Sequence, residues 1–181
     1  MEKALNASNG IMKGIKDKKL VIIDIETSGL CCGEDGNEPA HILRVDAIKI
    51  ENGVLKESFS SLVSCSKYIN KHVSALTGIS NKTLKNAPKI KTVLTQLKEF
   101  TYGHEVYARN SEFVNKFLSY YGDKKGVSID LAKANDSDEI AKTLNYAYVK
   151  ELLSAYKIDQ EQAEPIILAN LLIKMANEKQ L

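Results

Sequence analysis

The sequence contains few cysteines: Cys31, Cys32 and Cys65 are the only three among 181 residues. An odd count that includes an adjacent pair is a poor basis for a disulfide framework, and the spacing is not that of a zinc site. These residues are therefore expected to be free thiols, as in a reducing cytoplasm.

Long apolar runs are also missing. No run approaches the ~20 residues that a membrane-spanning helix needs. Residues 1–18 lack the apolar centre of a signal peptide and are expected to form a leader or a short helix. The sequence therefore predicts a cytoplasmic protein without membrane contact.

Charge of one sign is not in large excess, because the formal net charge is only +2. The chain thus lacks the global basic field that attracts polyanions. Two lysine-rich segments, residues 13–19 and 82–91, are either phosphate contacts or ordinary solvated faces.

The remaining composition suits one folded domain, which we place at residues 19–181. A hydrophobic fraction of 44% and a charged fraction of 27% are ordinary for a globular protein. Apolar and alternating runs predict strands, and Asn52-Gly53 is a strong hairpin signal. The expected strands are 19–26, 42–50, 54–63 and 104–109. The expected helices are a helical turn in "NKHVSALTG" closed by Gly78, a short helix in "SNKTLKNAP" stopped by Pro88, and longer helices over 89–101, 111–121, 136–144, 148–156 and 165–179. This order predicts an α/β fold with a mixed sheet whose first three strands are antiparallel.

Two carboxylates interrupt the first strand, in the stretch "LVIIDIETSGL". Asp24 and Glu26 are two positions apart, so strand geometry directs both to one face. Burying unpaired carboxylates side by side is costly, and the pair therefore needs a partner of positive charge. A metal ion or a basic side chain would meet this need.

Four ordered segments resemble the DEDD 3′→5′ exonuclease superfamily, the fold of the proofreading subunit of bacterial DNA polymerase III. They are "VIIDIETSGL", "ILRVDAIKIENGVLKESFSSLV", "ALTGISNKTLKNAP" and "VYARNSEFVNKFL", and "VKELLSAYKI" resembles the helix before the last motif. The resemblance covers roughly residues 19–179. It implies a ribonuclease H-like mixed sheet flanked by helices.

The resemblance also implies a chemistry and a site. Family members place two divalent metals between four carboxylates, and oxygen ligands suit Mg²⁺ or Mn²⁺. Asp24 and Glu26 would be the first two catalytic and metal-binding carboxylates. The residues that would bind the terminal nucleotide are Thr27, Ser28, Gly29, Leu30, Gly78, Ile79, Asn110 and Phe113.

The second acidic motif departs from the family pattern. Where the family has an Asp, this chain has Val114, although Asn110 and Phe113 keep the framework. Glu112 lies two positions earlier, which turns it about 200° away on a helix. It is therefore a poor substitute for the missing acid.

The third motif, a His followed five positions later by an Asp, admits two registers. One aligns Glu161 and Ile166 with these residues, and the other aligns Asp159 and Glu164. Neither supplies a histidine, and only the second supplies a further carboxylate, from Glu164. Metal binding would then be reduced to a single weak site or to none.

The second strand departs as well, because Arg44 replaces a family Glu and Asp46 replaces a small residue. An arginine directed toward Asp24 or Glu26 would neutralise them without metal.

We therefore expect an exonuclease-like domain with impaired catalysis that binds a single-stranded 3′ end, a nucleotide or a protein partner. Two alternatives stay open. An active, divergent exonuclease would use Asp24, Glu26 and Glu164, whereas a purely structural interaction protein would have its cleft filled, for example by Arg44.

Overall fold

The computed structural model describes residues 18–33, 39–108, 110–129, 135–136, 153–154, 157–159 and 164–178. The predicted leader lies almost entirely outside these residues. Of the helix expected over 148–156, Leu153 and Ser154 are described, and both are helical. Of the helix expected over 136–144, only Asp136 is described. Among the described residues, no helix is long and apolar enough to cross a membrane.

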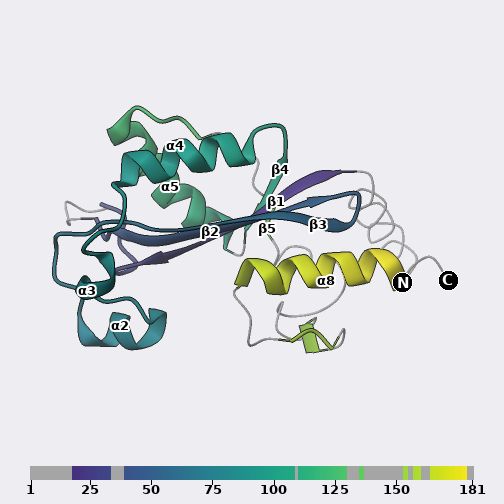
Figure 1. Cartoon of the computed structure of the whole chain (residues 1–181), viewed down its shortest axis with the longest axis horizontal. Coiled ribbons are helices and arrows are strands. Elements are labelled where there is room, and N and C mark those ends of the chain that lie inside the picture. The colour runs from purple at the N-terminus through teal and green to yellow at the C-terminus, as the bar shows by residue number, and fades with distance from the viewer. Residues whose placement is uncertain are drawn as a thin grey trace.

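A five-stranded mixed sheet forms the centre of the molecule, in the order β3-β2-β1-β4-β5 (Figure 1). The first three strands, β1 (Lys19–Thr27), β2 (Ile42–Glu51) and β3 (Val54–Leu62), are antiparallel neighbours. β4 (Glu105–Ala108) runs parallel to β1, and β5 (Asn135–Asp136) runs parallel to β4. The predicted α/β class and the antiparallel first three strands are confirmed.

Helices cover both faces of the sheet. α4 (Ile90–Thr101) and α5 (Ser111–Lys125) lie on one face, and α8 (Glu164–Glu178) lies on the other (Figure 1). Two short helices, α2 (Lys71–Thr77) and α3 (Asn81–Leu84), form a unit at one end of the sheet. The chain between β3 and α4 therefore builds a separate wall beside the end of β1.

Local signals explain where the two short helices begin and end. The side chain of Asn70 accepts a hydrogen bond from the Val73 backbone N–H at the start of α2. Gly78 ends this helix with φ of 69°, a conformation that glycine adopts without strain. Ser80 and Thr83 form a reciprocal capping box at the start of α3. These caps satisfy backbone groups at the helix ends, and they fix where each short helix begins or ends.

The core consists of two layers, one on each face of the sheet, and a small third cluster. Alternate residues of β1 divide between the layers, with Val21 and Ile23 facing α4 and α5 and with Leu20 and Ile22 facing α8. Strand pleating produces this division, so the apolar run of β1 is buried on both sides. The third cluster holds α2 and α3 on β2 through Leu43, Ile69, Ile79 and Leu84.

One expectation needs correction. Asp136 was expected to begin a helix, but it pairs with Ala108 as the last residue of β5. The short helix expected before Pro88 is α3, which ends at Leu84. The other described elements agree with expectation to within a few residues at their ends.

Candidate functional site

The two carboxylates of β1 lie on the sheet face that carries α8. They continue the alternation of Leu20 and Ile22, which pack in that layer. In the β1–β2 ladder, Asp24 is directly opposite Asp46, and Glu26 is directly opposite Arg44. Three acids and one arginine therefore share a small area of two neighbouring strands.

Arg44 provides positive charge to two of these acids. Its Nε lies 2.7 Å from Oδ2 of Asp46, and its Nη2 lies 3.6 Å from Oε1 of Glu26. The buried Nε–H does not meet hydrogen-bond geometry toward Asp46, so this short contact is best described as an ion pair. Ser60 donates a hydrogen bond of 2.6 Å to the other Asp46 oxygen. The sequence suggested that Arg44 contacts Asp24 or Glu26, and the structure shows it in contact with Glu26 and Asp46.

The second motif leaves no carboxylate at the position expected from the family. Val114 is 2% exposed and packs in the core layer beneath α4 and α5. Glu112 is exposed to solvent on the first turn of α5. Asn110 begins this helix in the left-handed region, and its side chain accepts a hydrogen bond from the Phe113 N–H. The framework of the motif therefore serves to start a helix.

The third motif falls at the start of α8. Glu164 is the first residue of this helix, but its side chain lies outside the described set, and so does all of Glu161. Asp159 is exposed, Ile166 is partly buried against the α8 layer, and Ile167 is buried within it. The two registers therefore remain predictions.

The family resemblance implies Mg²⁺ or Mn²⁺, and the described residues can be tested against such ions. No group of three or more His, Cys, Asp or Glu side chains in the described part of the chain is arranged to hold a metal. Glu26, one of the two predicted ligands, is paired instead with a guanidinium. Within the described residues, the donor set does not fit a two-metal centre.

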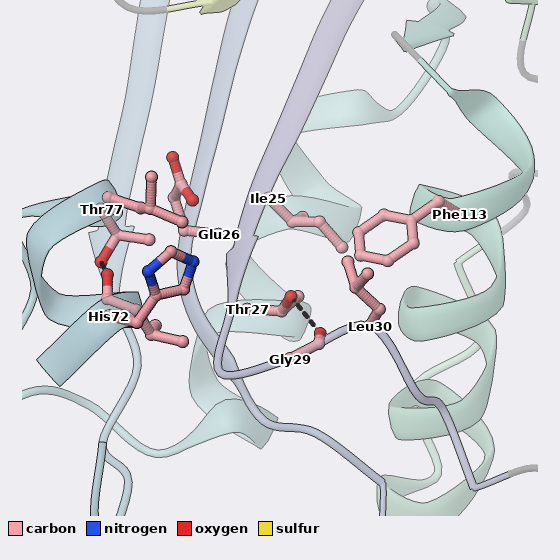
Figure 2. Close-up of a pocket in the computed structure, with 10 residues that line it drawn as sticks. Ile25, Glu26, Thr27, Gly29, Leu30, His72, Thr77 and Phe113 are labelled. Atoms are coloured by element: carbon pink, nitrogen blue, oxygen red, sulfur yellow. Dashed lines mark hydrogen bonds between the residues drawn. The ribbon is translucent and has the colours of Figure 1, made fainter. Parts of the chain in front are cut away.

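A pocket of about 410 Å³ opens beside the end of β1. Figure 2 shows Ile25, Leu30 and Phe113 along one side and α2 along the other. The complete lining is Ile25, Glu26, Thr27, Gly29, Leu30, His72, Val73, Leu76, Thr77 and Phe113. The pocket therefore joins the first motif to the separate α2–α3 wall.

Most polar side chains of the pocket are already engaged. The Thr27 hydroxyl donates to the Gly29 carbonyl at 2.6 Å, and the Thr77 hydroxyl donates to the Val73 carbonyl at 2.9 Å (Figure 2). Glu26 pairs with Arg44. His72 makes no hydrogen bond or ion pair with the described residues, so its ring is the polar lining group best able to contact a ligand.

The pocket contains only part of the predicted nucleotide-binding set. Thr27, Gly29, Leu30 and Phe113 line it. The remaining four residues do not line the pocket. Ser28 accepts a hydrogen bond from the His41 N–H, and Ile79 is buried in the third cluster. Gly78 caps α2, and Asn110 caps α5. Sequence reasoning missed His72, although its position six residues before Gly78 places it on the helix that leads to a predicted contact.

The loop that follows β1 is fastened at its far end. The Tyr121 hydroxyl donates to the Ala40 carbonyl at 2.8 Å, and the Ser28 N–H donates to the His41 carbonyl at 2.8 Å. Burial, with smaller effects from neighbouring groups, raises the pKa of Tyr121 to about 12. Burial also lowers the pKa of His41 below 6.5. Both shifts favour the neutral rings, which lie beside each other at the far end of this loop.

The fold, the paired acids of β1 and the pocket beside them define a ribonuclease H-like domain of the nuclease class. The chain belongs to the RNase_T exonuclease family, because the family model described as "Exonuclease" matches residues 21–164.

Two curated relatives are DNA polymerase III components. The chain is 28% identical to the PolC-type DNA polymerase III of Staphylococcus epidermidis over 142 residues, which are 78% of this chain and 10% of that protein. It is 32% identical to DNA polymerase III subunit epsilon of Aquifex aeolicus over 114 residues, which are 60% of this chain and 54% of the relative. The chain therefore matches only part of the length of each relative.

Solved structures support the fold. A 3′-exonuclease described in 3′-end-specific recognition of a histone mRNA stem-loop gives a TM-score of 0.73 at 15% identity, covering 96% of this chain and 70% of its own. Exonuclease X in complex with 5′-overhanging duplex DNA gives a TM-score of 0.60 at 19% identity, covering 90% and 93%. At these identities the likeness concerns the fold.

Proposed function

We propose that this exonuclease-family domain binds the 3′-terminal nucleotide of a single strand in the pocket beside β1, and that its hydrolytic activity has lapsed. The observation that carries the proposal is the ion pairing of Arg44 with Glu26 and Asp46. Positive charge that a divalent ion would supply is built into the sheet. Nucleotide binding would then need no metal.

Loss of hydrolysis is supported by the groups around this pair. Two-metal catalysis depends on several anionic ligands that act as a unit, so the loss of one costs orders of magnitude in rate. Val114 is buried in the core, and Glu112 faces solvent. The predicted second motif therefore supplies no carboxylate to Asp24 and Glu26.

Nucleotide binding is supported by the size and lining of the pocket. Its volume of about 410 Å³ falls within the range of ~300–1,000 Å³ typical of small-ligand sites. Phe113 and Leu30 offer an aromatic face and an apolar edge to a base, and base–aromatic stacking is worth about 1–3 kcal/mol. His72 stands on the opposite wall, where a sugar or phosphate oxygen would meet it.

Degradation of a 3′-labelled single-stranded oligonucleotide tests the catalytic part of the proposal. The folded protein is incubated with Mg²⁺ and then with Mn²⁺, beside an Asp24→Ala variant that reports contaminating nuclease. We expect no shortening above the level of the variant. Metal-dependent shortening that disappears in the variant would show that the divergent site is active.

Binding of the same oligonucleotide in the presence of EDTA tests the other part. Fluorescence anisotropy should show binding without metal, and a 3′-terminal nucleoside monophosphate should compete for the pocket. A Phe113→Ala variant should bind more weakly because stacking is lost. If the intact protein binds no strand at all, the cleft would be better described as a structural or protein-binding surface.

A further inference from the structure

The chain between β3 and α4 is strongly and exclusively basic. Residues 64–91 contain six lysines and no Asp or Glu, in a protein whose net charge is only +2. We call this segment the basic wall. Its lysines are Lys67, Lys71, Lys82, Lys85, Lys89 and Lys91, and all six are exposed.

Some lysines on the strands of the sheet, or next to them, are paired with acids. On the strands and next to them, Lys18 pairs with Glu105 at 2.7 Å, Lys19 with Glu51 at 3.6 Å, and Lys49 with Glu57 at 2.8 Å. Within the described residues, no ion pair involves the lysines of α2, α3 or the start of α4: Lys71, Lys82, Lys85, Lys89 and Lys91. The positive charge of these five lysines of the basic wall is thus not neutralised by described acids.

The basic wall is also a wall of the pocket. His72, Val73, Leu76 and Thr77 of α2 line it, and Lys71 precedes His72 on the same helix. The α2–α3 unit lies at one end of the sheet, apart from α4, α5 and α8 (Figure 1). Its charge therefore lies where a chain leaving the pocket can run over it.

We propose that the basic wall binds the phosphates of a nucleic-acid strand whose terminal nucleotide lies in the pocket. This inference rests on the proposed function and adds a second contact to it. Lysine contacts to phosphate release counterions and carry no sequence information, so the wall supplies affinity along the strand. Tyr68, which is 75% exposed, presents an aromatic ring on the same segment for an unpaired base.

A single strand fits this arrangement better than an anionic protein surface. The size and mostly apolar lining of the pocket beside Phe113 suit a nucleobase, and Lys71 directly precedes the lining residue His72. A nucleic-acid strand repeats this combination of a base and a phosphate at each unit. An acidic peptide provides charge without a group suited to the pocket.

Salt dependence of binding tests the proposal directly. Binding of a single-stranded oligonucleotide is measured at several salt concentrations for the intact protein, for Lys82→Gln/Lys85→Gln and for the control Lys56→Gln/Lys98→Gln. Lys56 and Lys98 are exposed on β3 and α4, so both double variants remove the same charge. Thermal unfolding confirms that each variant is folded.

For a single strand, the slope of log K against log salt is about −0.7 per phosphate contacted. If both wall lysines contact phosphates, Lys82→Gln/Lys85→Gln should make the slope less negative by about 1.4, whereas the control should leave it unchanged. Equal slopes in the two variants would overturn the role of the wall.

A circular single strand separates this inference from the proposed function. If the linear strand binds more tightly than the circular one and only the wall variant loses salt dependence, both proposals stand. If the two strands bind equally but the wall variant is still selectively weakened, end recognition is wrong and the wall stands. If the linear strand is preferred but the wall variant behaves as the control, the wall is wrong and end recognition stands.

Discussion

Arg44 and Glu26 face each other across the β1–β2 pair, with Nη2 of the arginine 3.6 Å from Oε1 of the acid. In the next register position, Asp24 is directly opposite Asp46. Like charges opposite one another destabilise a sheet, and Arg44 offsets this repulsion by pairing with Asp46 as well. Arg44 therefore stabilises the strand pair and also supplies positive charge to its acids.

Replacing Arg44 by alanine should expose this double role. We expect the free energy of unfolding to fall by about 1 kcal/mol, because the side chains involved are partly exposed. We also expect Mn²⁺ binding to increase, since the carboxylates of Glu26 and Asp46 then lack their guanidinium. Urea denaturation and isothermal calorimetry measure the two effects. Arg44→Lys, which keeps the charge, should bind no more Mn²⁺ than the intact protein. If Arg44→Ala also binds no more Mn²⁺ than the intact protein, this account is contradicted.

Restoring an acid at position 114 should damage the protein more than it restores activity. Val114 is 2% exposed within the core layer, so Val114→Asp buries a carboxyl group among apolar side chains. We expect a loss of about 3 kcal/mol or more in stability. Val114→Ala, which removes apolar contact without adding charge, should cost about 1.5–3 kcal/mol. A stable Val114→Asp protein with metal-dependent nuclease activity would show that this side chain can reach the cleft.

Removing the imidazole of His72 should weaken nucleotide binding. His72→Ala loses one ligand contact, worth about 1 kcal/mol, and the Kd of a nucleoside monophosphate should rise about fivefold. Competition against a labelled oligonucleotide measures this change. Ser74→Ala on the same helix does not alter the pocket lining and serves as the control. Unchanged affinity in His72→Ala would remove His72 from the binding site.

Acidification should lower the stability of the folded protein through His41. Burial lowers the pKa of His41, so the folded protein favours the neutral ring. The contribution of this shift to the free energy of unfolding is complete above pH 6.5, and it is lost as the pH falls from 6.5 through the pKa of His41 in the folded protein. Urea midpoints above and below this range should show the loss in the intact protein and a smaller loss in His41→Gln. The same pH dependence in both proteins would assign the effect to other groups.

Much of the fold could be predicted because its signals are local. The apolar run of β1, the Asn52-Gly53 turn and the apolar spacing of α4 each determine one element without reference to the rest. Asn52 has the positive φ of 53° that such a turn requires. Asp136 was misassigned because its strand pairing depends on β4, which lies almost thirty residues earlier.

The candidate site was predicted less completely, because its parts meet only in three dimensions. Arg44 was identified because it replaces a family Glu in the second strand, and its pairing with Glu26 follows from strand register. His72 was not, because a histidine on a short helix is unremarkable until that helix is folded against the end of β1. Likewise, the lysine-rich character of residues 82–91 gained meaning only when α3 was placed next to α2, which lines the pocket.

The wall formed by α2 and α3 is anchored by a cluster of only four buried side chains, separate from the two large layers of the core. Such a unit is expected to open without unfolding the sheet, so its backbone amides should exchange with solvent earlier than those of β1. A molecule held between this wall and Phe113 would be released whenever the wall opens. Its residence time would follow that local opening, whereas the sheet would stay intact through many cycles of capture and release.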